Sequence, residues 1–138
     1  MMSASENEAL VRRFLEEAYN RGNLAVGDEL LAENCVFYTP APIPGIAGWK
    51  QFATAFLTAF PDDMQVTIDD LFAVGDKVTA RWTARGTHNG PLRGIPPSGN
   101  QVTWLGMAIY SLSDGKITEV WGLNDALGIM QQVGVIPS

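Results

Sequence analysis

The second half of the chain carries four strand-like runs, and the third run is apolar on both of its faces. The runs cover residues 64–74, 77–87, 101–112 and 116–123. They are separated by a Gly-Asp pair, by a long segment rich in glycine and proline, and by an Asp-Gly pair, all of which favour turns. Four long strands in succession predict one sheet, so the rest of the chain has to pack against it.

Side chains alternate between the two faces of these runs. In the run 77–87, small and aromatic residues alternate with threonine and arginine, as expected for a strand with one buried face. In the run 101–112, one face carries Val102, Trp104, Ala108 and Tyr110, and the other carries Leu105, Met107 and Ile109. Because three or four short helices can cover only one such face, we expect a homodimer through the sheet to cover the other.

The first half of the chain predicts helices. Ser3 followed by Glu6 fits a capping box, and apolar residues at helical spacing then predict a helix over residues 6–20. A shorter helix capped by Asn23 is expected next, and a third helix over residues 49–60. Helices followed by a meander of strands predict an α+β domain, in which a curved mixed or antiparallel sheet wraps around the N-terminal helices.

Length and charge exclude several classes of protein. The 138 residues fit a single domain, 1–138, with an ordered core from about residue 6 to residue 136. A formal charge of −6 and a pI of about 4.6 argue against a nucleic-acid partner. No apolar stretch reaches the roughly 20 residues of a membrane span, and the N-terminus lacks the apolar segment of a signal peptide. We therefore expect no membrane partner and a cytoplasmic location.

One cysteine and one histidine limit the chemistry further. Cys35 has no partner for an internal disulfide, and its apolar neighbours favour a buried thiol. With His88 as the single histidine, a His-rich metal site is excluded, and we expect no metal.

Two segments are predicted to be loops. Residues 40–48, PAPIPGIAG, hold three prolines and two glycines, which argues against regular hydrogen-bonded structure. This segment is either folded over a pocket mouth or a plain packed connection. Residues 90–100, GPLRGIPPSGN, are either a rim or lid over a cavity or a long hairpin connection.

The last strand-like run leads into the first candidate for chemistry. If the strand alternates regularly, one face carries Ile117, Glu119, Trp121, Leu123 and then Asp125. A carboxylate at the end of an apolar, aromatic strand face is a candidate acid or base. The competing interpretation is that Asp125 caps the C-terminal helix through hydrogen bonds to its first N–H groups.

Three segments together resemble a known family. They are the helix VRRFLEEAYNRGNL, the run RWTARGTHNGPLRGIPPSGNQV and the ending GKITEVWGLNDALGIMQQVG. They resemble the SnoaL-like polyketide cyclases, or ester cyclases, which belong to the superfamily of nuclear transport factor 2-like and ketosteroid isomerase-like cone folds. The resemblance implies one central apolar pocket inside the cone, usually in a homodimer. It also implies a cofactor-free intramolecular aldol ring closure on an apolar polyketide ester.

The resemblance also suggests roles for individual residues. Asp125 is the match to the general acid/base of the family, and His88 in GTHNG is the match to its polar partner. Candidate contacts to the substrate are Phe37, Phe56, Arg81, Trp104, Met107 and Trp121. Arg81 is expected either to steady a carbonyl group or to lie on a solvated or dimer face.

Three functions compete at this point. The first is the cyclase, or a related isomerase that abstracts a proton from a carbonyl compound. The second is a non-catalytic protein that binds a hydrophobic small molecule in the same pocket, and the third is an epoxide hydrolase. The position of Asp125 separates them, because an acid/base enzyme requires this carboxylate to face the cavity.

Overall fold

The computed structural model describes residues 2–137 and contains one six-stranded sheet. The strands are β1 (Leu31–Tyr38), β2 (Pro42–Pro44), β3 (Gln65–Val74), β4 (Lys77–Thr87), β5 (Gln101–Ser113) and β6 (Lys116–Asn124). Their order across the sheet is β2-β1-β6-β5-β4-β3. Only β1 and β6 pair in parallel, and all the other neighbours are antiparallel. The predicted α+β architecture with a curved, mixed sheet is confirmed.

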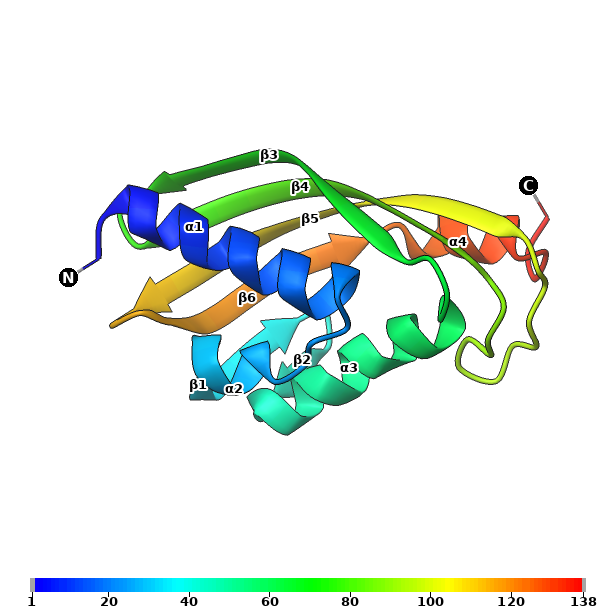
Figure 1. Ribbon diagram of the computed structural model, residues 1–138, viewed down its shortest axis with the longest axis horizontal. Coiled ribbons are helices and arrows are strands. Elements are labelled where there is room, and N and C mark those ends of the chain that lie inside the picture. The colour runs from blue at the N-terminus through cyan, green and yellow to red at the C-terminus, as the bar shows by residue number, and fades with distance from the viewer. Residues whose placement is uncertain (1, 138) are drawn as a thin grey trace.

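The helices lie along one face of this sheet (Figure 1). They are α1 (Ala4–Leu15), which continues as the π-helix η1 (Glu16–Asn20), α2 (Val26–Leu30), α3 (Gly45–Ala59) and α4 (Ala126–Gln132). Helix α1 packs along β3 and β4, and α3 packs along β1 and β2. No helix in residues 2–137 is long and apolar enough to cross a membrane.

The N-terminal helix begins at the predicted capping box. The Ser3 side chain accepts a hydrogen bond from the Glu6 backbone N–H, and the Glu6 carboxylate accepts one from the Ser3 N–H in return. The prediction that Asn23 caps the second helix is wrong, because its amide instead donates to Glu17.

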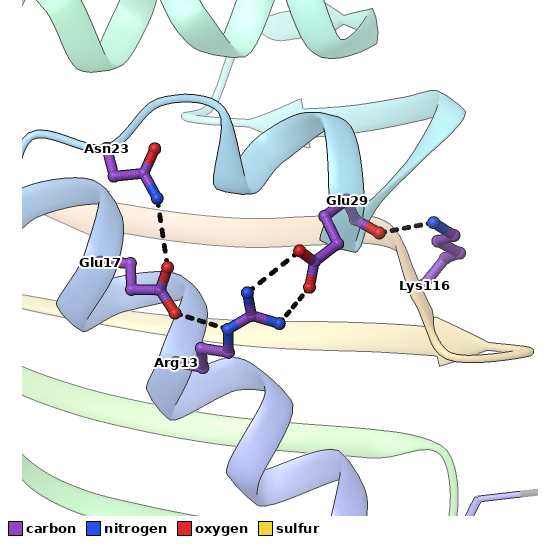
Figure 2. Close-up of polar contacts among 5 residues, drawn as sticks. All are labelled: Arg13, Glu17, Asn23, Glu29 and Lys116. Carbon is purple, nitrogen blue, oxygen red and sulfur yellow. Dashed lines mark hydrogen bonds and ion pairs between the residues drawn. The ribbon is translucent and has the colours of Figure 1, made fainter.

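A network of charged side chains joins α1 to α2 and to the start of β6 (Figure 2). The Arg13 guanidinium contacts both carboxylate oxygens of Glu29, and it also donates to Glu17. Lys116, at the start of β6, donates to the backbone carbonyl of Glu29. These contacts tie both helices to the same end of the sheet.

The proline-rich segment after β1 is more regular than its sequence suggests. Residues Pro42–Pro44 form the short edge strand β2, in which Ile43 pairs with Phe37 of β1. An edge strand tolerates proline because its missing N–H groups would face away from the sheet. Helix α3 then begins at Gly45, four residues before the predicted start.

A bulge in β6 decides which of its side chains face the helices. Ser111 pairs with Glu119 and Leu112 with Ile117, so Thr118 is an extra residue without a partner in β5. Such an insertion moves every later side chain to the opposite face. Glu119, Trp121 and Leu123 therefore share a face as expected, but Ile117 lies on the opposite, inner face, and that part of the prediction is wrong.

Candidate functional site

A cavity of about 430 Å³ lies between the helices and the inner face of the sheet, the face that α1 and α3 cover. Its wall is largely aromatic and aliphatic, with contributions from Phe14, Phe37, Phe52, Phe56, Trp82, Trp104, Ala108 and Val120. At its mouth, the exposed lining residues include Ala41, Arg93 and Ala126. A cavity of this size and composition is typical of sites for small organic molecules.

Three of the predicted substrate contacts line this cavity. Trp104 lies on β5, Phe37 on β1 and Phe56 on α3. The Trp104 ring packs against Phe60 at 4.9 Å and against Phe56 at 5.8 Å between ring centroids. These residues form a rigid aromatic wall.

The polar centre of the cavity is Asn124, the last residue of β6. Its Oδ1 accepts hydrogen bonds from the indole Nε1 of Trp82 and from that of Trp104, each at 3.2 Å. Only the oxygen of an amide can accept two N–H donors, so the orientation of this amide is fixed. Its NH₂ group donates no hydrogen bond within residues 2–137, and Asn124 lines the cavity, so this amide is a donor that the site can offer to a ligand.

The reach of Trp82 to Asn124 depends on a glycine. Trp82, Gly106 and Asn124 lie side by side on β4, β5 and β6. A Cβ atom on Gly106 would lie 2.2 Å from the Trp82 Nε1. The indole therefore crosses β5 only because position 106 has no side chain.

Two tyrosine hydroxyls add further neutral donors. Tyr19 accepts a hydrogen bond from the indole Nε1 of Trp49 at 3.4 Å, which leaves its own proton free to donate. Burial raises the pKa of Tyr19 to about 12 and raises that of Tyr110 as well. Both residues line the cavity, so both present protonated hydroxyls at neutral pH.

Asp125 does not line the cavity, contrary to the prediction. It is exposed and forms the N-cap of α4, where its Oδ1 accepts a hydrogen bond from the Gly128 N–H at 2.9 Å. The bulge at Thr118 explains the difference, because it turns Asn124 inward and Asp125 outward. Of the two interpretations of Asp125, its position in the structure matches that of a helix cap.

His88 also lies outside the cavity lining, in the base of the loop between β4 and β5. It is fully buried, and its Nδ1 accepts a hydrogen bond from the Ser98 backbone N–H at 3.1 Å. Its own backbone N–H donates to the Asn100 carbonyl at 2.8 Å. His88 thus holds the two ends of the loop together.

The other three predicted contacts lie on the opposite face of the sheet. Trp121 and Met107 are more than half exposed, at 53% and 56%. Arg81 is held by Asp70 at 2.7 Å and Asp69 at 3.7 Å, and its hydrogen bond to Asp70 raises its pKa. None of the three lines the cavity. Of the two expectations for Arg81, the position on a solvated or dimer face is therefore the one that fits the structure, and contact with a substrate carbonyl group is not.

The residues that make the site polar were not among the predicted site residues: Tyr19, Trp82, Arg93, Tyr110 and Asn124. Regular alternation along 117–125 also puts Asn124 on the face of Val120 and Gly122, opposite Asp125, and this grouping is correct. The prediction named the carboxylate of Asp125 and not this amide. Among residues 2–137, no group of three or more His, Cys, Asp or Glu side chains is arranged to hold a metal ion.

Solved structures share this fold over almost the whole chain. TsrD from Streptomyces laurentii is 31% identical, with a TM-score of 0.87 and coverage of 99% of this chain and 100% of that one. IdmH from Streptomyces antibioticus is 30% identical, with a TM-score of 0.79 and coverage of 93% and 98%. AclR from Streptomyces galilaeus, described as a candidate hydroxylase, is 27% identical, with a TM-score of 0.89 and coverage of 99% and 85%.

The family assignment comes from the sequence. No curated protein sequence matches the chain. The family model of SnoaL-like polyketide cyclases matches residues 9–133, which include all six strands, helices α3 and α4, and the part of α1 that lines the cavity. The chain therefore belongs to the family of SnoaL-like polyketide cyclases.

Proposed function

We propose that the protein is an enzyme of the cyclase or isomerase type that acts on an apolar carbonyl compound through its enolate. The observation that carries this proposal is the fixed amide of Asn124, whose oxygen accepts both indole N–H groups and whose NH₂ group is not used by either of them. In an apolar cavity, a donor that needs no reorganisation stabilises a developing oxyanion strongly.

The cavity favours neutral donors over an acid/base pair. Its described lining includes no aspartate, glutamate, histidine or lysine. Inside the cavity, the groups available to a substrate oxygen are the Asn124 amide and the hydroxyls of Tyr19 and Tyr110. Thr39 and, at the mouth, Arg93 also belong to the lining. Such a set can bind an enolate oxygen but cannot itself remove a proton from carbon at neutral pH.

The proposed reaction follows from this inventory. A C–H group between two carbonyls is acidic enough to give its proton to water, and the amide stabilises the resulting enolate oxygen. The enolate carbon then forms a bond to a second carbonyl carbon of the same molecule, and the new alkoxide takes a proton from water. The aromatic wall folds the substrate so that the two carbons meet, which supplies an orientation effect.

A non-catalytic binding protein is the second candidate. The same absence of an acid or base from the described lining favours it. An epoxide hydrolase is less well supported, because that reaction needs a pocket carboxylate to activate water. AclR, which has the same fold, is described as a candidate hydroxylase, so the fold alone does not determine the reaction class.

The experiment measures enolate formation directly. Ethyl benzoylacetate, an aryl β-keto ester, is incubated in D₂O, and exchange of its C2 protons is followed by NMR with and without the protein. We expect the protein to accelerate exchange, and Asn124→Ala to reduce the acceleration by a factor of about 10²–10³. Calorimetric titration of the same ester measures binding separately.

Asn124→Asp is the sharper variant, since it keeps an acceptor for both indoles and removes the donor. The proposal expects exchange to be lost, because the carboxylate repels the enolate. Faster exchange would show that the pocket works by base catalysis and would overturn the proposal. Asn23→Ala, at an exposed position on the helical side, is the matched control. Binding without any acceleration in the wild type would favour the binding protein.

We further propose a homodimer through the outer face of the sheet, the face turned away from the helices. Ile109 pairs with Trp121 and Met107 with Leu123 across β5 and β6, and all four side chains are about half exposed or more. Leu105 extends the same patch along β5. A contiguous apolar patch of this kind is typical of a surface covered by another chain.

A further inference from the structure

The loop between β4 and β5 places an arginine at the mouth of the cavity. Leu92 and Ile95 exchange two backbone hydrogen bonds, of 2.9 and 2.8 Å, around a two-residue turn made by Arg93 and Gly94. Leu92 is buried and lines the cavity, so it anchors the turn from inside. Arg93 is exposed at the tip and lines the mouth of the cavity.

The backbone of this turn is unfavourable for an arginine. Arg93 has a φ of +46° and Gly94 a φ of +86°. Glycine or asparagine is favoured at both positions of such a turn, because a positive φ brings the Cβ atom too close to the backbone. Strained residues of this kind cluster at sites that clamp ligands.

The Arg93 side chain has no ion-pair or hydrogen-bond partner among residues 2–137. Arg21 and Arg85 share this property, but neither lines the cavity. Arg93 is also the single charged residue in the described lining of the cavity. The chain as a whole carries a formal charge of −6, so an anion would approach an unfavourable surface elsewhere. An unpaired guanidinium at an apolar mouth therefore provides a local site for an anion.

A shallow groove beside the mouth continues the same site. Arg93, Ile43 and Phe52 line both the cavity and this groove, which runs between β2 and α3. The groove is also formed by Pro42, Pro44 and Gln51. A ligand with its body in the cavity can thus extend past Arg93 toward the groove.

We infer that the ligand of this cavity is an apolar molecule with a carboxylate end, and that Arg93 binds this carboxylate at the mouth. The inference rests on the proposed function only in that the cavity takes an apolar small molecule. The planar guanidinium of arginine matches a carboxylate with two parallel hydrogen bonds. Arg93 selects the acid over the corresponding ester and orients the ligand with its apolar body innermost.

The test compares an acid with its uncharged ester. Binding of 2-naphthylacetic acid and of methyl 2-naphthylacetate is measured by isothermal titration calorimetry at neutral pH, with wild type and Arg93→Gln. We expect the wild type to bind the acid about fivefold to tenfold more tightly than the ester. In Arg93→Gln this ratio falls to about one, while the affinity for the ester is unchanged.

Two controls keep the result specific. Arg85→Gln makes the same charge change at an exposed position of β4 outside the described cavity lining, and it should keep the wild-type ratio. High salt should lower the ratio in the wild type, because an exposed ion pair is screened.

The outcomes separate this inference from the proposed function. If the wild type binds both compounds equally, or if Arg93→Gln keeps the preference for the acid, the role of Arg93 is overturned while the cavity remains a ligand site. If the wild type binds neither compound, the apolar ligand site fails, and both proposals fail with it.

Discussion

The inner and outer faces of the sheet are both apolar, but their polar groups differ in kind. On the inner face, Trp104 is 3% exposed and the polar groups are neutral, as at Asn124 and Tyr110. On the outer face, Trp121 is 53% exposed, and charged groups such as Arg81 lie beside the apolar residues. Polar groups in a cavity can stay only if they are neutral or paired, whereas charges are tolerated where water reaches them. The kind of polar group therefore identifies the pocket face more reliably than apolar content does.

The largest expected effect comes from removing a ring on each face. Trp104→Ala should lower the free energy of unfolding by about 3–5 kcal/mol, because it leaves a cavity among Phe56 and Phe60. Trp121→Ala should cost at most about 2 kcal/mol, since half of that ring is already in water. Urea unfolding measures both. Equal losses would mean that the outer ring is as well buried in solution as the inner one.

A charge on the outer face tests the proposed dimer. Ile109→Glu should raise the dissociation constant of the dimer at least about 100-fold, because a carboxylate would be buried without a partner. Sedimentation equilibrium measures the mass, and circular dichroism checks the fold. Gln51→Glu, on the exposed surface of α3, should leave the mass unchanged. A wild-type protein that is monomeric at high concentration would remove the dimer proposal.

The neutral donors of the inner face predict a pH effect on stability. An unfolded tyrosine ionises near pH 10, whereas the folded pKa of Tyr19 is about 12. The unfolded state therefore loses this proton first, and stability falls as the pH rises from 10 to 12, by up to about 1.4 kcal/mol per pH unit. Tyr19→Phe should show a shallower fall in urea unfolding over this range. A fall as steep as that of the wild type would contradict the burial of the hydroxyl.

The smallest expected effect separates capping from catalysis at Asp125. Asp125→Ala should cost about 1 kcal/mol by loss of the cap, and Asp125→Asn should cost almost nothing because asparagine caps equally well. Exchange of the keto ester protons should be unchanged in both variants. If Asp125→Asn abolished exchange with its fold intact, the carboxylate would regain a chemical role.

The first helices, the four long strands and the two apolar faces could be predicted from local patterns, whereas the short edge strand β2 could not. Alternation along β4 and β5 identified which side chains share a face, and the capping box identified the start of α1. These features depend on neighbours within a few residues, which the sequence displays directly.

The polar part of the site could not be predicted in the same way, for a physical reason. The extra residue at Thr118 reverses the faces of β6, and no local pattern marks it. The hydrogen bonds to Asn124 come from β4 and β5, so they depend on the register of three strands. The position of Arg93 depends on a turn whose anchor, Leu92, is buried in the cavity wall.

The absence of a side chain at Gly106 restricts which substitutions this pocket can accept during evolution. Replacing this glycine by alanine would push the Trp82 indole away, so Asn124 would lose one of the two hydrogen bonds that its oxygen accepts. The three positions can therefore not drift independently. In related sequences, a larger residue at the position of Gly106 should be accompanied by the loss of the tryptophan on one side, the asparagine on the other, or both. Such covariation would separate members that share the Trp82–Asn124 hydrogen bond from members that share only the fold.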